Sequence, residues 1–368
     1  MVIVALAAHG VVLALWPDAH VLMIDLQVYR AGAEHVLGGQ PLYDGGVLLT
    51  LPFVYPPFAA VAFVPLVALP LVPLKVLWTA ATLALLGYVV HRGLRSLGAP
   101  APALCTVAAV AIATWLDPVR TTLYLGQINV VLLAVVLGDV LGRRDSRWRG
   151  VGVGLAAAIK LTPLLFVLYL LLVGRVRAAL TAAGTFVAAV AVGFLVAPAD
   201  SAAYWLRGTF AAADRISAVA ATTNHSLNGL LARTLGESRA LYLAGAALLG
   251  AAALVLAARA HRRGDELLGV TLVGLCTCAV APFAWSHHWV WVVPLAVVLA
   301  HRGAHVMFGL TLAATTAVIT ALPGPQVGPI PRTGLISLAP DTYVLLFAVV
   351  LVWAAHNTAK PRSRNLVA

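Results

Sequence analysis

The chain has 368 residues, of which 62% are apolar and 10% charged, and its mean hydropathy is +0.97. A soluble globular domain averages about 45–50% apolar and about 25% charged residues, so this composition excludes one. It also excludes a disordered chain, a disulfide-rich scaffold and a free nucleic-acid-binding domain, even though the net charge is +11. We therefore expect an all-α polytopic membrane protein whose basic residues set its orientation in the bilayer.

Apolar runs recur from end to end and predict about twelve membrane-spanning segments within a single domain, residues 1–368. The expected spans are 2–16, 72–90, 101–116, 126–141, 150–160, 162–173, 179–197, 240–258, 266–283, 289–300, 303–321 and 341–356. The fifth and sixth are too short to cross unaided, and we expect the break after Lys160 to join them into a hairpin. Because no Lys or Arg precedes the first span, the natural start of the protein could lie upstream.

The segment from Phe53 to Pro70 is apolar but rich in proline, and its assignment decides the topology. Treated as a full span, it would place Arg92 and Arg95 opposite the later basic loops. Treated as an interfacial half-helix, it gathers fifteen of the 24 Lys and Arg residues on one side, which is then cytoplasmic. These are Arg92, Arg95, Arg143, Arg144, Arg147, Arg149, Arg175, Arg177, Arg259, Arg262, Arg263, Arg302, Lys360, Arg362 and Arg364.

The long segments then fall on the outer side, where we expect the functional site. They are residues 17–71, 198–239 and 322–340, whereas residues 357–368 form a basic cytoplasmic tail. No internal repeat is visible. This topology predicts a multi-pass protein of the plasma membrane with an extracytoplasmic site.

The chain has only 13 acidic residues, so each one can be considered individually. Asp265 and Glu266 follow a cluster of arginines, and we expect them to be solvated loop charges. Asp139 lies near the inner end of a span, where pairing with Arg143 is the simple explanation. Asp25 differs, because it has apolar neighbours on both sides just beyond the first expected span.

A carboxylate in an apolar pocket has a raised pKa and can accept a proton from a substrate. Asp25 is therefore a candidate general base. The alternative is that it caps a short helix running from about Leu26 to Leu37. The spacing of the residues leaves both possibilities open.

A series of short motifs makes the sequence recognisable. In chain order they are Asp25–Tyr29, Gly39–Asp44, Phe53–Phe58, Tyr124–Asn129, Lys160–Pro163, Asn224–Leu227 and Trp285–Trp289. Each motif alone is weak, but the ordered series, over about residues 22–295, resembles the actinobacterial mannosyltransferases of glycosyltransferase family 87. That family has the GT-C fold and uses polyprenyl-phosphate-mannose to make alpha-(1→2) linkages in phosphatidylinositol mannosides and lipoglycans.

The resemblance implies a GT-C fold in which the first outer loop carries two juxtamembrane helices and a catalytic aspartate, here Asp25. The implied reaction is a single inverting displacement in which Asp25 accepts the proton of the acceptor hydroxyl. Polyprenyl phosphate is a fair leaving group, so no second carboxylic acid is needed. A retaining glycoside hydrolase, by contrast, needs two carboxyl groups about 5 Å apart. The scarcity of acids therefore favours a transferase.

Charge that develops on the donor phosphate calls for cations or N–H donors. Lys160 lies within an apolar run, where an ammonium group is costly and indicates function, unless it snorkels to the interface. His287 and His288 lie in an outer loop beside Trp285, where they can contact the sugar or the phosphate. The alternative is an interfacial tryptophan belt with hydrated histidines.

Further polar residues are candidates for contacts with donor or acceptor. Gln127 and Asn129 begin a span, where they either line a cavity or satisfy the helix start. Tyr55 precedes two prolines that fix the entry to the second interfacial helix, and it can face the donor. The remaining candidates, for acceptor binding, are Asn224, His225 and Asn228 together with Trp285, with helix capping as the alternative for the asparagines.

We expect no metal site, because adjacent histidines point in different directions and no outer cluster of carboxylates can hold a divalent cation. We also expect no cofactor beyond the donor substrate. The expected partners are the bilayer, polyprenyl-phosphate-mannose and a glycolipid acceptor. Two alternatives remain: a transporter or flippase of lipid-linked sugars, and a GT-C transferase that uses another polyprenyl-linked sugar such as arabinose.

Overall fold

The computed structural model describes residues 22–100, 103–143, 146–211, 217–316 and 339–359. Three expected features lie wholly or mostly outside these ranges: the first span at 2–16, the outer segment 322–340 and the basic tail 357–368.

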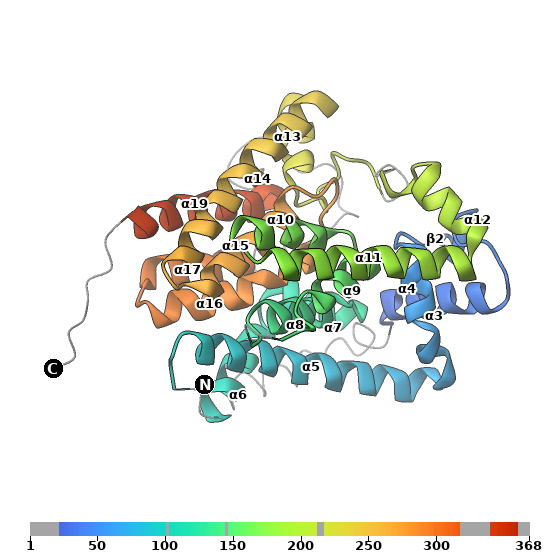
Figure 1. Ribbon diagram of the computed structural model, residues 1–368, viewed down its shortest axis with the longest axis horizontal. Coiled ribbons are helices and arrows are strands. Elements are labelled where there is room, and N and C mark those ends of the chain that lie inside the picture. Colours follow the sequence, from blue (N-terminus) through green and yellow to red (C-terminus); the bar gives the residue numbers. More distant parts are fainter. Residues whose placement is uncertain (1–21, 101–102, 144–145, 212–216, 317–338, 360–368) are drawn as a thin grey trace.

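The described chain is mostly helical, with one two-stranded antiparallel hairpin between α3 and α4 (Figure 1). The α-helices are α3 (Ile24–Leu37), α4 (Pro57–Ala62), α5 (Leu71–Ser96), α6 (Ala103–Ala113), α7 (Asp117–Leu125), α8 (Asn129–Val140), α9 (Val151–Ile159), α10 (Leu165–Leu172), α11 (Val176–Val196), α12 (Pro198–Ser201), α13 (Leu227–Leu235), α14 (Arg239–Arg262), α15 (Glu266–Ala279), α16 (Val292–His301), α17 (His305–Thr315) and α19 (Thr342–Ala359). Short 3-10 or π turns are η1 (Val64–Ala68), η2 (Thr162–Leu164), η3 (Ala202–Leu206), η4 (Thr209–Ala211) and η6 (Ser286–Trp291), and the strands are β1 (Gly46–Leu48) and β2 (Leu51–Pro52).

Four helices in the described ranges are long and apolar enough to cross a membrane: α5, α11, α14 and α19. The bent pair α7 and α8 makes a fifth if it is counted as one span. Large apolar side chains on these helices point outward, such as Val76 and Leu248, as expected where lipid is the solvent. The protein is therefore a helical membrane protein, but the figure of twelve spans stays a prediction.

The proline-rich segment Phe53–Pro70 contains short helical pieces, α4 and η1. Pro57 starts α4, and Pro65 lies in the first turn of η1, because proline fits the start of a helix but interrupts its interior. α3 packs on both pieces, and α4 packs on α11. α3, β2, α4 and α12 thus gather around one end of α11 (Figure 1).

Gly126 joins α7 to α8 through a sharp bend of 117°. Its φ of 68° lies in the left-handed region, which glycine adopts without steric cost. A Cβ at this position would lie 2.7 Å from the Cβ of Leu26, so any other residue would collide with α3. The bend therefore brings Gln127, the next residue, directly against the helix that carries Asp25.

The opposite end of the bundle, here called the arginine end, is held by ion pairs among Arg149, Arg175, Arg302, Asp265 and Glu266. Glu266 lies against the guanidinium groups of both Arg149, at 3.3 Å, and Arg175. Asp265 pairs with Arg302. The expectation that these two acids are solvated loop charges is therefore wrong, because α15 begins at the junction of three arginine-bearing loops.

Asp139 has a role beyond the expected one beside Arg143. Its carboxylate accepts hydrogen bonds from the backbone N–H groups of Gly150, at 2.8 Å, and Val153, at 2.9 Å. These are donors that the first turn of α9 leaves without partners inside the helix. Asp139 on α8 therefore caps α9 rather than serving only as a helix-end charge beside Arg143.

Candidate active site

The motif residues converge from separate elements where α3, the α7–α8 bend, the α9–η2 break and η6 meet. α7 and α8 both pack on η6, and α3 packs on α7. The break between α9 and η2 is local in origin: Lys160 is extended, with φ −148° and ψ 126°, and Pro163 follows within the next turn. This break turns Lys160 out of the helix and toward the other motif residues.

Asp25 is the second residue of α3, whose N-cap position is occupied by Met23. The alternative that Asp25 caps this helix is therefore wrong. Its Oδ2 accepts a hydrogen bond of 2.6 Å from Nε2 of Gln127. Burial raises the pKa of this carboxyl to about 6, against the opposing effects of the Gln127 hydrogen bond and the nearby Lys160 ammonium group.

Two carboxamides connect Asp25 to Lys160. Oε1 of Gln127 accepts a long hydrogen bond of 3.4 Å from Nδ2 of Asn129, and Oδ1 of Asn129 accepts one of 3.0 Å from Nζ of Lys160. Nζ also lies 2.8 Å from Nε2 of His288 and 5.9 Å from the ring centre of Tyr55. A carboxylate and an ammonium group from distant parts of the chain are thus held in one network without direct contact.

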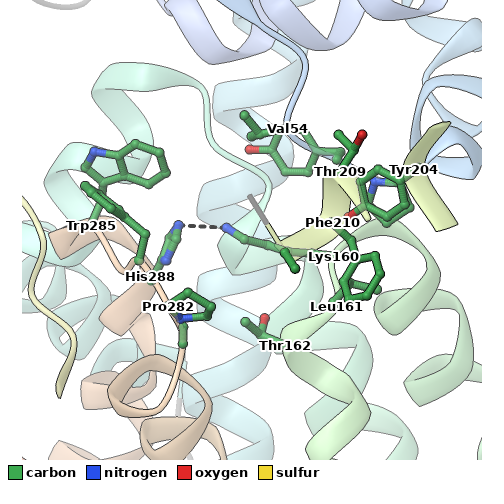
Figure 2. A pocket seen from close by; sticks show the side chains of 15 residues that line it. Val54, Lys160, Leu161, Thr162, Tyr204, Thr209, Phe210, Pro282, Trp285 and His288 are labelled. Carbon is green, nitrogen blue, oxygen red and sulfur yellow. Dashed lines mark hydrogen bonds between the residues drawn. The ribbon is translucent and has the colours of Figure 1, made fainter. Parts of the chain in front are cut away.

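Two neighbouring cavities open on this network. The Asp25 cavity, of about 410 Å³, is lined by Asp25, Gln127, His225 and His287, among others. The Lys160 cavity, of about 140 Å³, is lined by Lys160, Thr162 and His288 together with apolar groups that include Tyr204 and Phe210. Figure 2 shows Lys160 and His288 pointing toward one another in this second cavity.

Tyr55 and Trp285 line both cavities and therefore form their common wall. Trp285 also stacks on the ring of His287, with centroids 5.6 Å apart and planes 16° from parallel. A substrate that reaches from one cavity into the other must pass these two aromatic side chains. Aromatic faces of this kind suit the apolar faces of sugar rings.

Each histidine has one ring nitrogen that is buried and lacks a hydrogen-bond partner among the described residues. These atoms are Nε2 of His287 and Nδ1 of His288. Because the Lys160 ammonium group can only donate, Nε2 of His288 accepts and its Nδ1 carries the proton. Buried polar atoms rarely lack partners, and both of these belong to side chains that line a cavity, which makes the two histidines candidates for contact with a bound ligand.

Of the four residues predicted for acceptor binding, Trp285 lines both cavities, and the other three separate into two kinds. Nδ2 of Asn224 and Nδ2 of Asn228 donate to the carbonyl oxygen of Pro282, at 3.4 and 3.1 Å, and clamp the loop before η6. Neither asparagine is among the described residues that line the two cavities. His225 does line the Asp25 cavity, and its Nδ1 lies 2.8 Å from the carbonyl oxygen of Pro340.

Tyr29 was not singled out from the sequence, yet it lies at the centre of the network. Its hydroxyl donates to Oε1 of Gln127 at 2.7 Å and lies 3.1 Å from the hydroxyl of Tyr55. The available signal was its spacing of four residues from Asp25, which places both side chains on one face of α3. The other predicted residues of the donor side, Tyr55, Gln127, Asn129, Lys160, His287 and His288, are brought together.

Comparison with known proteins bears directly on this site. The model of glycosyltransferase family 87 matches residues 53–282, a stretch that contains Lys160 but neither Asp25 nor the two histidines. A polyprenol-phosphate-mannose-dependent alpha-(1-2)-phosphatidylinositol mannoside mannosyltransferase of Mycobacterium tuberculosis is 42% identical over 302 residues, covering 76% of this chain and 70% of the relative. No solved structure matches the chain.

Two relatives from Mycolicibacterium smegmatis cover more of the chain. One carries the same name as the M. tuberculosis protein and is 40% identical over 337 residues, 82% of this chain and 76% of its own length. The other is a polyprenol-phosphate-mannose-dependent alpha-(1-2)-phosphatidylinositol pentamannoside mannosyltransferase, 34% identical over 353 residues, 91% of this chain and 85% of its own length. The resemblance seen in the motifs is thereby confirmed. The chain belongs to glycosyltransferase family 87 and is a hexosyltransferase.

Proposed function

We propose that the chain transfers mannose from polyprenyl-phosphate-mannose to a phosphatidylinositol mannoside and forms an alpha-(1→2) linkage. The activities for which its relatives are named support both the donor and the acceptor class. The observation that carries the proposal is the placement of Asp25 and Lys160 in adjacent cavities with Tyr55 and Trp285 between them. Such a site has a proton acceptor on one side of the reacting carbon and a cation on the other.

Asp25 is the general base in this proposal. Oδ2 is engaged by Gln127, so the proton of an acceptor hydroxyl in the Asp25 cavity passes to the carboxylate through Oδ1. The hydroxyl oxygen attacks the anomeric carbon as the bond from that carbon to the phosphate oxygen breaks, and the electron pair leaves with polyprenyl phosphate. One displacement inverts the configuration, so a beta-linked donor gives an alpha product.

Lys160 and His288 receive the donor phosphate. Lys160 and His288 both line the Lys160 cavity, and charge-assisted hydrogen bonds from an ammonium group to phosphate oxygens are among the strong ones. The apolar walls of that cavity, which include Tyr204 and Phe210, suit the first isoprene units of the lipid. This arrangement stabilises the charge that develops on the leaving phosphate.

We further propose that the site faces the outer side of the plasma membrane. The arginine end lies at the other end of the bundle from α3 and α4, and clusters of arginine in short loops mark the cytoplasmic side. On that orientation the donor and acceptor lipids both enter the site from the outer leaflet.

The test is the transfer of labelled mannose from polyprenyl-phosphate-mannose to phosphatidylinositol mannosides by the purified protein in lipid nanodiscs. We expect Asp25→Asn to lower the rate by about a thousandfold, the scale of a lost general base. Glu34→Gln is the matched control, because Glu34 is an exposed acid on the same helix that pairs with Arg30. Full transfer by Asp25→Asn would refute the mechanism.

Two further arms test the other parts of the proposal. Polyprenyl-phosphate-arabinose is offered as donor in parallel, and its preferential use would replace mannose in the proposal. Movement of the intact lipid-linked sugar across the bilayer without transfer would instead favour a flippase. EDTA is expected to leave the rate unchanged, because Lys160 supplies the positive charge that a metal ion would otherwise bring to the phosphate.

A further inference from the structure

The carboxamide of Gln127 has two chemically opposite ends, and only one orientation supports the charge of Asp25. Its NH₂ group donates to Oδ2 of Asp25, whereas its oxygen, if turned toward the carboxylate, would repel it. The side chain would keep nearly the same shape in either orientation. Its orientation is therefore decided by the group that Oε1 meets on the other side.

We propose that Tyr29 is a positioning residue for the base: its hydroxyl holds the Gln127 carboxamide with the NH₂ group toward Asp25. The hydrogen bond from Tyr29 to Oε1 is 2.7 Å long, the usual length of a well-formed O–H···O bond. The proposal rests on the role of Asp25 as base in the proposed function.

The second donor to Oε1 is weaker. Nδ2 of Asn129 lies 3.4 Å from Oε1 of Gln127, but only 2.9 Å from the carbonyl oxygen of His287. Asn129 is therefore engaged mainly with the backbone of η6. Tyr29 supplies the principal restraint on the carboxamide.

Tyr29 is itself held in one position. It is fully buried, its ring stacks on Phe63 with centroids 4.6 Å apart, and the ring of Tyr55 meets it edge to face at 5.2 Å. Because the Tyr29 hydroxyl donates its single proton to Gln127, it accepts from the Tyr55 hydroxyl and from the backbone N–H of Ile128. The hydrogen bonds from Tyr55 to Tyr29, from Tyr29 to Gln127 and from Gln127 to Asp25 thus all run in the same direction, toward the carboxylate.

Tyr29→Phe removes this restraint without changing the charged groups around the carboxylate. The titratable groups that face Asp25 from other elements are Tyr55, Lys160, His225 and His287, and all of them remain. Once the carboxamide is free to turn, its hydrogen bond to Asp25 weakens. The ionised form of Asp25 then loses support, so its protonation should extend to higher pH.

The experiment compares Tyr29→Phe with Tyr43→Phe. Tyr43 is also buried in the first outer segment, but its hydroxyl donates to the carbonyl oxygen of Tyr55 rather than to Gln127. On the acidic side of the pH–rate profile, the transfer rate falls along what we call the acid limb. We expect Tyr29→Phe to shift this limb to higher pH by about half a unit and to lower the rate at neutral pH several-fold. Tyr43→Phe should leave the limb at the same pH.

A double-mutant cycle with Gln127→Met shows whether Tyr29 acts through the carboxamide. Methionine has a similar shape but no donor, so Tyr29→Phe should cause no further shift of the acid limb in that background. An unchanged limb in Tyr29→Phe would overturn the proposal. So would a shift of equal size with and without Gln127.

Infrared titration of the Asp25 carboxyl, with Asp25→Asn as the spectral blank, separates this proposal from the proposed function. If the wild-type protein transfers no mannose, the proposed function fails. An upward shift of the carboxyl titration in Tyr29→Phe but not in Tyr43→Phe would still support the positioning role. An unshifted titration would refute it independently of any transfer.

Discussion

The two ends of the bundle handle buried charge in opposite ways. At the arginine end, Glu266 lies directly against the guanidinium groups of Arg149 and Arg175. At the site, Asp25 and Lys160 are joined only through the carboxamides of Gln127 and Asn129. Direct pairing uses the charges to fasten loops together, whereas separation by neutral groups keeps each charge available to a substrate.

The largest effect is expected from removal of the cation at the site, which tests whether its charge acts on a substrate. We expect Lys160→Met to lower the rate of mannose transfer by about a hundredfold, since a preorganised donor to the developing charge is lost. Lys75→Met, which removes a lysine from α5, is the control and should leave the rate within about twofold, as expected for a change that removes no group from the site. Full activity of Lys160→Met would show that the donor phosphate does not bind at Lys160.

A smaller effect should follow from pH. Burial raises the pKa of Asp25 to about 6, and the base acts only when it is ionised. The transfer rate should therefore be level above this value and fall by about tenfold for each pH unit below it. Rate measurements between pH 4.5 and 8 in wild type check the position of the limb. A limb centred near the ordinary aspartate pKa would contradict the description of Asp25 as a desolvated base.

The smallest effect on the rate is expected from a substitution at the arginine end, which should lower the stability of the fold instead. Glu266→Gln leaves Arg149 and Arg175 without their shared carboxylate and should destabilise the fold by about 2 kcal/mol, less than for a fully buried pair because Glu266 is 20% exposed. Thermal unfolding in detergent measures this loss, with the exposed Glu237→Gln as control. A large fall in the transfer rate of the folded variant would show that the two ends are coupled.

The sequence predicted the members of the site better than their contacts. Lys160 was recognisable because an ammonium group within an apolar run is costly, and Asp25 because its neighbours on both sides are apolar. His288 was recognisable because it lies beside Trp285 in an expected outer loop. The bond between Asp25 and Gln127, by contrast, joins residues 102 positions apart, and no local pattern encodes such a pairing. For the same reason Glu266 was expected to be a solvated charge, although it pairs with arginines that lie in other loops.

The membrane segments show a second limit. Hydropathy predicted a span at residues 126–141, which corresponds to α8, but it did not register that a separate helix, α7, precedes that span across a bend of 117°. The bend follows from the left-handed backbone of Gly126, which a hydropathy count does not detect. Likewise, the Asn224 motif looked like part of a binding surface, although the loop that it clamps, at Pro282, comes from a different part of the chain.

Gly126 has a consequence for how the site is specified. A single methyl group there would collide with Leu26 and push α3 away from the bend. Asp25 on α3 would then move away from Gln127, although no polar atom of the site had been changed. The distance between the carboxylate of Asp25 and the carboxamide of Gln127 thus depends on the absence of a side chain at Gly126. How closely the backbones of α3 and of the bend approach one another therefore decides whether the hydrogen bond between Asp25 and Gln127 can form.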